Sequence, residues 1–156
     1  MNIKAAIIGM GIGQKHFEAI ENYKGAKVEI ICERDKKKIT HLKKKYPNIV
    51  ITNDQNKIFD NKGINLVSIA SYDNFHFNQI SKSIKNNKHI IVEKPMCLNF
   101  SELRKINNLL RKKKTIKIFS NLVLRVNSLF KHFKKKTDKD KIFYIEADYI
   151  WGRKEK

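Results

Sequence analysis

The sequence predicts a doubly wound α/β fold, a parallel sheet with helices on both faces, and three observations carry that prediction. An apolar run at residues 3–8 leads into the turn Gly9-Met10-Gly11-Ile12-Gly13, which is followed by a helical stretch. Short apolar runs then alternate with amphipathic stretches along most of the chain. The second apolar run ends on Glu33, 20 residues after Gly13. This order of strand, glycine turn, helix, strand and acid is typical of a dinucleotide-binding βαβ unit.

The alternation of patterns gives the expected elements in order. Strands are expected at 4–8, 28–32, 49–52, 65–70, 89–93 and 116–120, and helices at 14–23, 36–45, 55–59, 75–86, 101–112 and 127–136. Ser101 is expected to cap the helix that it begins, because its hydroxyl can accept a hydrogen bond from a free backbone N–H group. The βαβα order favours a parallel sheet over separate strand and helix domains.

The glycine turn predicts a site for a pyrophosphate. Gly9 and Gly11 allow a tight turn and a close approach of the ligand, because no side chain stands in the way. Ile12 and Gly13 lead into a helix whose N-terminus presents unpaired N–H groups and the positive end of its dipole. The third glycine stands one residue earlier than the common G-x-G-x-x-G spacing places it. A glycine turn that binds no ligand is the alternative interpretation.

Glu33 and Arg34 predict the choice of cofactor. A carboxylate at the end of the second strand can accept hydrogen bonds from both hydroxyl groups of the adenosine ribose, and it repels a 2′-phosphate. We therefore expect NAD to be preferred over NADP. Arg34 weakens that preference, since a guanidinium group can pair with the phosphate.

The segment Glu93-Lys94-Pro95 predicts the chemistry of the site. It closes the fifth strand, at the sheet edge where ligands bind in open α/β folds. Lys94 can hydrogen-bond a substrate hydroxyl and favour the loss of its proton while a hydride leaves. Glu93 is expected to orient Lys94 or to contact the cofactor ribose. An ordinary surface lysine after a strand is the alternative.

Polar residues after the fourth and sixth strands are expected to complete the site. Ser71, Asn74 and His76 follow the fourth strand and are expected near the nicotinamide, although a structural role for His76 is an alternative. Arg125 is expected to hold an anionic or hydroxyl-rich substrate, with a salt bridge as the alternative. His16, one turn into the first helix, is expected to be structural.

The net charge of +19 raises the question of nucleic-acid binding. The sequence contains 29 Lys, 23 Ile and 16 Asn residues but only 5 Arg residues, a skew that an AT-rich genome produces without selection for a ligand. Nucleic-acid readers commonly rely on Arg, so nucleic-acid binding is not favoured.

Cys32 and Cys97 lack disulfide or metal-ligand spacing and are expected to be reduced and buried, and no metal is expected. Without an apolar run of membrane-spanning length or a leader pattern, we expect no membrane partner and a cytoplasmic protein.

The tail predicts a division into three parts. Residues 1–122 form the expected dinucleotide-binding domain, 123–140 a connecting helical segment, and 141–156 the start of a second, α+β domain. An aromatic-rich strand is expected at 142–151, and a strand of that apolarity needs neighbours. We therefore expect the chain to be the front part of a longer protein, either a fragment or a truncated product.

These residues together resemble the N-terminal domain of the glucose–fructose oxidoreductase/inositol dehydrogenase (Gfo/Idh/MocA) family. The matching segments are I-I-G-M-G-I-G-Q-K-H (7–16), I-C-E-R-D (31–35), S-I-A-S-Y-D-N-F-H (68–76), K-H-I-I-V-E-K-P (88–95) and L-R (124–125). The resemblance implies a Rossmann-like domain of a nicotinamide-dependent oxidoreductase that acts on sugars, sugar nucleotides or cyclitols. It implies that Lys94 is catalytic and that the family's second domain, which supplies a catalytic histidine and most oligomer contacts, is absent. Tyr72 stands where many members carry proline.

The sequence therefore predicts an NAD-binding domain that is inactive by itself. The resemblance is compatible with a homo-oligomer in a full-length form, but the sequence does not give the oligomeric state. The expected cofactor contacts are Gly9, Gly11, Ile12, Gly13, Glu33, Arg34, Ser71, Asn74, His76, Glu93 and Lys94, and the expected substrate contacts are Lys94 and Arg125. A non-catalytic dinucleotide-binding module and a basic nucleic-acid-binding protein are the alternatives.

Overall fold

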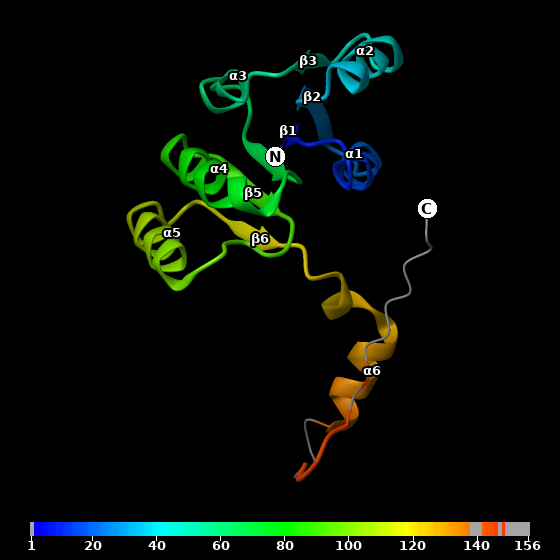
Figure 1. Cartoon of the computed structure of the whole chain (residues 1–156), viewed down its shortest axis with the longest axis vertical. Coiled ribbons are helices and arrows are strands. Elements are labelled where there is room, and N and C mark those ends of the chain that lie inside the picture. The colour runs from blue at the N-terminus through cyan, green and yellow to red at the C-terminus, as the bar shows by residue number, and fades with distance from the viewer. Residues whose placement is uncertain (1, 138–141, 147, 149–156) are drawn as a thin grey trace. The chain divides into compact units, whose positions relative to one another are not determined.

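The computed structural model describes residues 2–137, 142–146 and 148 and contains a six-stranded, all-parallel sheet in the order β3-β2-β1-β4-β5-β6 (Figure 1). The strands are β1 (Ile3–Ile8), β2 (Ala26–Cys32), β3 (Val50–Thr52), β4 (Leu66–Ile69), β5 (His89–Val92) and β6 (Ile118–Ser120). The predicted doubly wound α/β fold is therefore confirmed.

Helices connect successive strands, as the alternating patterns predict. They are α1 (Gly13–Glu21), α2 (Lys36–Lys45), α3 (Asn56–Phe59), α4 (Asp73–Lys85) and α5 (Phe100–Lys112), followed by the 3₁₀ turn η1 (Val123–Val126) and by α6 (Ser128–Thr137). The predicted cap of α5 is wrong. Asn99, not Ser101, has the extended backbone of a capping residue, and its side chain accepts a hydrogen bond from the N–H of Glu102 at 3.0 Å.

Two hydrophobic cores lie on the two faces of the sheet, because neighbouring residues of a strand point to opposite faces. In β1, Ala6 and Ile8 belong to one core and Ala5 and Ile7 to the other. Figure 1 shows α4 and α5 on one side of the strands and α1 on the other. The first core adds Ile58, Ile80, Ile84 and Ile106 from α3, α4 and α5, and the second adds Phe17, Ile20 and Leu42 from α1 and α2. The Cys32 thiol is buried in the first core and Cys97 is half-buried, so full burial was predicted correctly for Cys32 alone.

A buried lysine braces the loop that precedes β4. The Lys88 side chain is 1 % exposed, and its Nζ donates to the carbonyl oxygens of Asn61 at 2.6 Å and Ile64 at 3.0 Å. Burial lowers the pKa of Lys88, and the negative charge of Asp60 partly opposes this lowering. The start of β5 is thereby joined to the loop between α3 and β4.

The strand order places a ligand-binding crevice beside β1. The chain runs outward in one direction through β2 and β3 and in the other through β4, β5 and β6, so the order reverses at β1. Ligands of open α/β sheets bind at such a point, beyond the carboxyl ends of the strands. The fold alone therefore predicts where a site should lie.

The chain divides into two compact units between Asn121 and Leu122. The sheet and its helices form the first unit, whereas η1 and α6 belong to the second. The strand expected at 142–151 is not formed by the residues described there, 142–146 and 148, and the rest of that range lies outside the described residues. A strand requires a hydrogen-bonded neighbour, and the described part of the chain supplies none to this segment.

Candidate functional site

A cavity of about 770 Å³ lies beyond the carboxyl ends of β1, β2 and β4. Among the residues predicted to bind a cofactor, it is lined by Gly9, Gly11, Ile12, Glu33, Arg34 and Ser71. Gly13, Asn74, His76, Glu93 and Lys94 do not line it, and Arg125 lies in η1 of the second unit. The cavity wall therefore includes the residues around the glycine turn but not the Glu93–Lys94 segment.

The glycines of the turn serve different purposes. Gly9 has φ of +89°, and a Cβ atom there would lie 2.6 Å from the carbonyl oxygen of Ala70, so only glycine fits without strain. A Cβ on Gly13 would lie 3.1 Å from the Ile7 side chain and 3.2 Å from that of Ala70, which lets α1 pack closely against the sheet. A Cβ on Gly11 would meet no atom within 4 Å. Gly11 therefore faces open space in the cavity.

The start of α1 presents unpaired donors. Within the part of the chain that the structure describes, no hydrogen-bond acceptor is recorded for the backbone N–H groups of Gly11, Ile12 and Gly13. The first bonds of the helix come from Gln14 and Lys15, which donate to Gly11 and Ile12. Three adjacent unpaired N–H groups at a helix N-terminus suit a phosphate, because they combine donors with the positive end of the dipole.

Glu33 joins the end of β2 to the glycine turn. Its Oε2 accepts from the N–H of Met10 at 2.9 Å, and its Oε1 accepts from the N–H groups of Arg34 at 2.7 Å and Asp35 at 3.1 Å. The residue is 8 % exposed and lines the cavity. Backbone donors therefore hold the carboxylate at the position where it can accept further hydrogen bonds from a ribose.

Positive charge flanks Glu33 on the cavity wall. The Arg34 guanidinium group stacks on the ring of Phe75, with its Cζ 5.1 Å from the ring centroid, and Lys38 lines the same wall. Burial raises the pKa of the neighbouring Cys32 thiol to about 11, so this thiol stays protonated at neutral pH. Besides these two cations, the wall carries the buried Glu33 and the exposed Asp35.

The loop after β4 is held by His76, which is fully buried. Its Nδ1 lies 2.7 Å from the carbonyl oxygen of Pro95, and its Nε2 lies 3.1 Å from that of Ser71. The hydroxyl group of Ser71 donates to Oε1 of Gln79 at 2.7 Å. His76 therefore joins the loop that lines the cavity to the segment after β5, where the Lys94–Pro95 peptide bond is cis.

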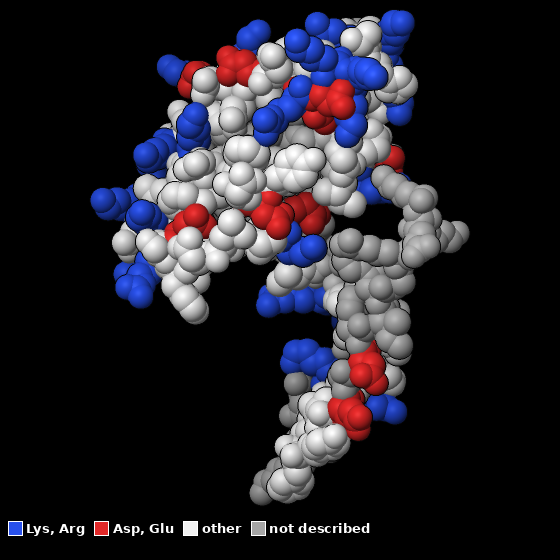
Figure 2. Space-filling model, in the orientation of Figure 1, with Lys and Arg blue, Asp and Glu red and all other residues white. Residues whose placement is uncertain are grey.

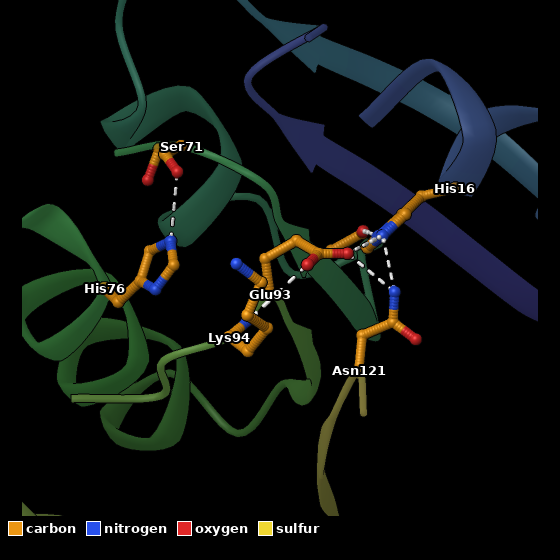
Figure 3. Close-up of polar contacts among 7 residues, drawn as sticks. His16, Ser71, His76, Glu93, Lys94 and Asn121 are labelled. Atoms are coloured by element: carbon orange, nitrogen blue, oxygen red, sulfur yellow. Dashed lines mark hydrogen bonds and ion pairs between the residues drawn. The ribbon is translucent and has the colours of Figure 1, made fainter. Parts of the chain in front are cut away.

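Glu93 lies at the centre of a second cluster, which Figure 3 shows with His16 and Asn121 converging on its carboxylate. Its Oε1 lies 2.8 Å from Nε2 of His16 and accepts a hydrogen bond from Nδ2 of Asn121 at 2.6 Å. Its Oε2 accepts from the N–H of Lys94 at a longer 3.4 Å. Burial alone raises the pKa of Glu93, but the hydrogen bonds from Asn121 and His16 outweigh it, and the pKa lies below its usual value.

Lys94 differs from its neighbours because its side chain is exposed. Among the described residues, no hydrogen bond or ion pair is recorded for its Nζ atom. Its ammonium group is therefore available to a ligand.

Sequence reasoning missed part of the cavity wall. It also missed the contacts of His16 with Ser68 and Glu93. Met10, Lys38, Asn53, Phe75 and Gln79 also line the cavity. Asn53 directly follows β3, so the rule that ligands lie beyond strand ends could have identified it. Phe75 and Gln79 lie one turn apart on α4, but their orientation depends on how that helix packs, which no local pattern reveals.

Charge is spread over the surface of the protein. Figure 2 shows Lys and Arg side chains around several elements, most densely near α2, with Asp and Glu among them. No helix within the described residues is long and apolar enough to cross a membrane. Nor do three or more His, Cys, Asp or Glu side chains cluster as metal ligands anywhere in 2–137, 142–146 or 148.

Known proteins resemble this chain in sequence and fold. The uncharacterized oxidoreductase YdgJ of Escherichia coli is 26 % identical over 110 residues, which are 69 % of this chain and 31 % of YdgJ. The scyllo-inositol dehydrogenase of Lactobacillus casei, solved with NAD(H) and scyllo-inositol, has a TM-score of 0.80 at 22 % identity over 89 % of this chain and 42 % of the enzyme. The biliverdin reductase of Synechocystis, solved with biliverdin and NADP⁺, has a TM-score of 0.79 at 15 % identity over 88 % and 43 %.

The chain thus spans about a third of YdgJ and about two fifths of each of these solved structures. At such identities the solved structures establish the fold alone. Membership is established by sequence, since residues 3–121 match the family GFO_IDH_MocA, described as "Oxidoreductase family, NAD-binding Rossmann fold". The chain belongs to the Gfo/Idh/MocA family and contains its NAD(P)-binding Rossmann domain.

Proposed function

We propose that the chain binds NAD as part of an oxidoreductase that transfers a hydride between nicotinamide and a secondary alcohol of a sugar, sugar nucleotide or cyclitol. The observation that carries the proposal is the set of unpaired N–H groups at Gly11, Ile12 and Gly13, two of which belong to residues lining the cavity. A pyrophosphate would accept hydrogen bonds from these groups, and the open space at Gly11 would allow it to approach.

The position of Glu33 supports NAD over NADP. Its carboxylate is held at the cavity wall by Met10, where a 2′-phosphate would bring a second negative charge close to it. Arg34 and Lys38 on the same wall favour the phosphate, so the preference is modest rather than absolute. Among the solved relatives, one holds NAD(H) and another NADP⁺.

The substrate assignment rests on Lys94 and on the relatives. An exposed ammonium group at the end of β5 can hydrogen-bond a hydroxyl group and stabilise the alkoxide that forms as hydride leaves. We propose that Asn74, His76 and Glu93 belong to the nicotinamide side, where His76 and Glu93 act through the backbone segments that they hold. The substrate contact of Arg125 stays a prediction. The L. casei relative, solved with scyllo-inositol, supports a polyhydroxylated substrate. We further propose a cytoplasmic protein and a homo-oligomer in any longer form.

The test is a fluorescence titration of the 156-residue chain with NADH and NADPH, repeated with Glu33→Ala. We expect saturable binding that favours NADH and is weakened in the variant, and we expect no steady-state oxidation of inositols or sugars by the chain alone. Absence of binding to either nucleotide by a folded chain would refute the proposed site. Binding of oligonucleotides that is unaffected by Glu33→Ala would favour the nucleic-acid alternative.

A further inference from the structure

His16 occupies a position that its sequence context does not reveal. It lies in the first turn of α1, directly after the glycine turn, and it is 8 % exposed. Its two ring nitrogens contact residues from two other elements, Ser68 of β4 and Glu93 at the end of β5. The helix that begins at the predicted phosphate site is therefore joined, through one side chain, to the segment that carries Lys94.

The ionised carboxylate of Glu93 only accepts hydrogen bonds, so Nε2 of His16 carries the proton that faces it. Nδ1 of His16 lies 2.6 Å from Oγ of Ser68, which is fully buried. A hydroxyl group can donate to Nδ1 of a neutral imidazole or accept from Nδ1 of a charged one. In both states Nε2 carries a hydrogen and donates to Glu93. The contact with the carboxylate therefore does not depend on the charge of His16.

The Glu93 carboxylate connects His16 to the backbone of Lys94. Oε1 receives donors from His16 and Asn121, while Oε2 faces the N–H of Lys94. The backbone N–H of Glu93 is also held, by the carbonyl oxygen of Ile69 at 2.9 Å. The groups that contact the carboxylate are thus His16 from α1, the amide of Asn121 after β6, and the N–H of Lys94, and they include no second carboxylate.

We propose that His16 is a positioning residue of the nucleotide site, which holds the Glu93 carboxylate in place and thereby sets the position of Lys94. His16 is not required to touch the cofactor or the substrate in this role. The importance of Lys94 rests on the proposed function, whereas the connection from His16 through Glu93 to the Lys94 N–H can be tested without it.

The test follows two groups by NMR while pH is lowered, in the whole 156-residue chain. The ¹³C signal of the Glu93 side-chain carboxyl, assigned by its loss in Glu93→Gln, reports the pKa of Glu93. The backbone ¹⁵N–H signal of Lys94 reports the same titration through its contact with Oε2. In His16→Leu, which removes both ring nitrogens, we expect the pKa of Glu93 to rise and the midpoint of the Lys94 signal to rise with it. NADH affinity is expected to fall about tenfold, because a charge-assisted hydrogen bond is lost.

The control is His41→Leu, the same change at an exposed position of α2, which is expected to alter none of the three measurements. Ser68→Ala provides a second variant if His16→Leu does not fold, because it removes only the partner of Nδ1. A smaller shift in the same direction is expected there.

The outcomes separate this inference from the proposed function. An unchanged pKa of Glu93 in both His16→Leu and Ser68→Ala would overturn the inference, as would a raised pKa that the Lys94 signal does not follow. A chain that binds no NADH would refute the proposed function. The connection from His16 to Lys94 would then still be decided by the two NMR titrations.

Discussion

The two sides of the crevice differ in whether backbone or side-chain groups face a ligand. On the glycine-turn side, the groups available to a ligand are backbone N–H groups, and the open space is created by a missing side chain at Gly11. On the β4–β5 side, the polar groups are side chains, and His76 and Glu93 already have hydrogen-bond partners within the protein. Among the predicted residues of that side, Lys94 presents an exposed charge.

This difference teaches how each side tolerates change. A site made of backbone depends on the path of the chain, so a single added carbon atom can remove it and the fold together. A site made of hydrogen-bonded side chains depends on charge and protonation, so its response to substitution varies with pH.

The largest effect is expected for Gly9→Ala. The added Cβ would lie 2.6 Å from a backbone oxygen, and φ of +89° is strained for any side chain. We expect a loss of about 3 kcal/mol or more in unfolding free energy, together with loss of NADH binding. Urea denaturation measures the loss, and Gly11→Ala, where a Cβ meets nothing within 4 Å, serves as the control. Equal stability of the two variants would show that the turn can accommodate a Cβ atom at residue 9.

Gly11→Asp is expected to separate binding from folding. The side chain would project into open space, so thermal stability should change little, but its negative charge would lie where the pyrophosphate binds. NADH affinity should fall at least about tenfold, which corresponds to roughly 1.4 kcal/mol. Gly11→Asn has nearly the same shape without the charge and should bind more tightly than Gly11→Asp. Normal NADH binding by Gly11→Asp would place the phosphate elsewhere.

Arg34→Gln sharpens the comparison within the glycine-turn side. Loss of the guanidinium group removes a partner for a 2′-phosphate but leaves Glu33 and its three backbone donors in place. NADPH affinity is expected to fall about fivefold while NADH affinity changes less than about twofold. Parallel titrations measure both, and an equal loss for both nucleotides would mean that Arg34 acts by stacking on Phe75 instead.

The smallest effect is expected for Glu93→Gln, as a change in the pH dependence of stability. Since the folded pKa of Glu93 lies below its usual 4.5, its charged form adds stability that is fully present above that value. That stability is lost as the pH falls through the folded pKa, where the unfolded chain binds more protons. The difference in Tm between the protein and the variant should therefore be about a few degrees at pH 7 and shrink in acid. A difference that is constant from pH 7 to pH 3 would contradict this.

The sequence predicted the glycine-turn side better than the β4–β5 side. Hydrophobic periodicity located each element of the sheet unit within two residues, and the G-x-G pattern placed the turn, because both depend on neighbours in sequence. The network of His16, Ser68, Glu93 and Asn121 joins residues up to 105 positions apart. No local pattern encodes such pairing. His16 was therefore predicted to be structural, but its partners Ser68 and Glu93 were not predicted. The capping of α5 by Asn99 was missed because Ser101, two residues later, has the same capping chemistry.

The buried Lys88 can report how often the protein opens locally. Most lysines among the described residues are exposed to an amine-reactive reagent in the native state, whereas Lys88 is enclosed, with its Nζ held by the Asn61 and Ile64 carbonyl oxygens. Acylation of Lys88 requires the loop before β4 to detach from the start of β5, so its labelling rate measures how often these elements separate. Lowering of its pKa by burial does not help the reagent reach it. Slow labelling of this amine, followed by mass spectrometry, would give the local opening rate at the start of β5, the strand whose other end leads to Glu93 and Lys94.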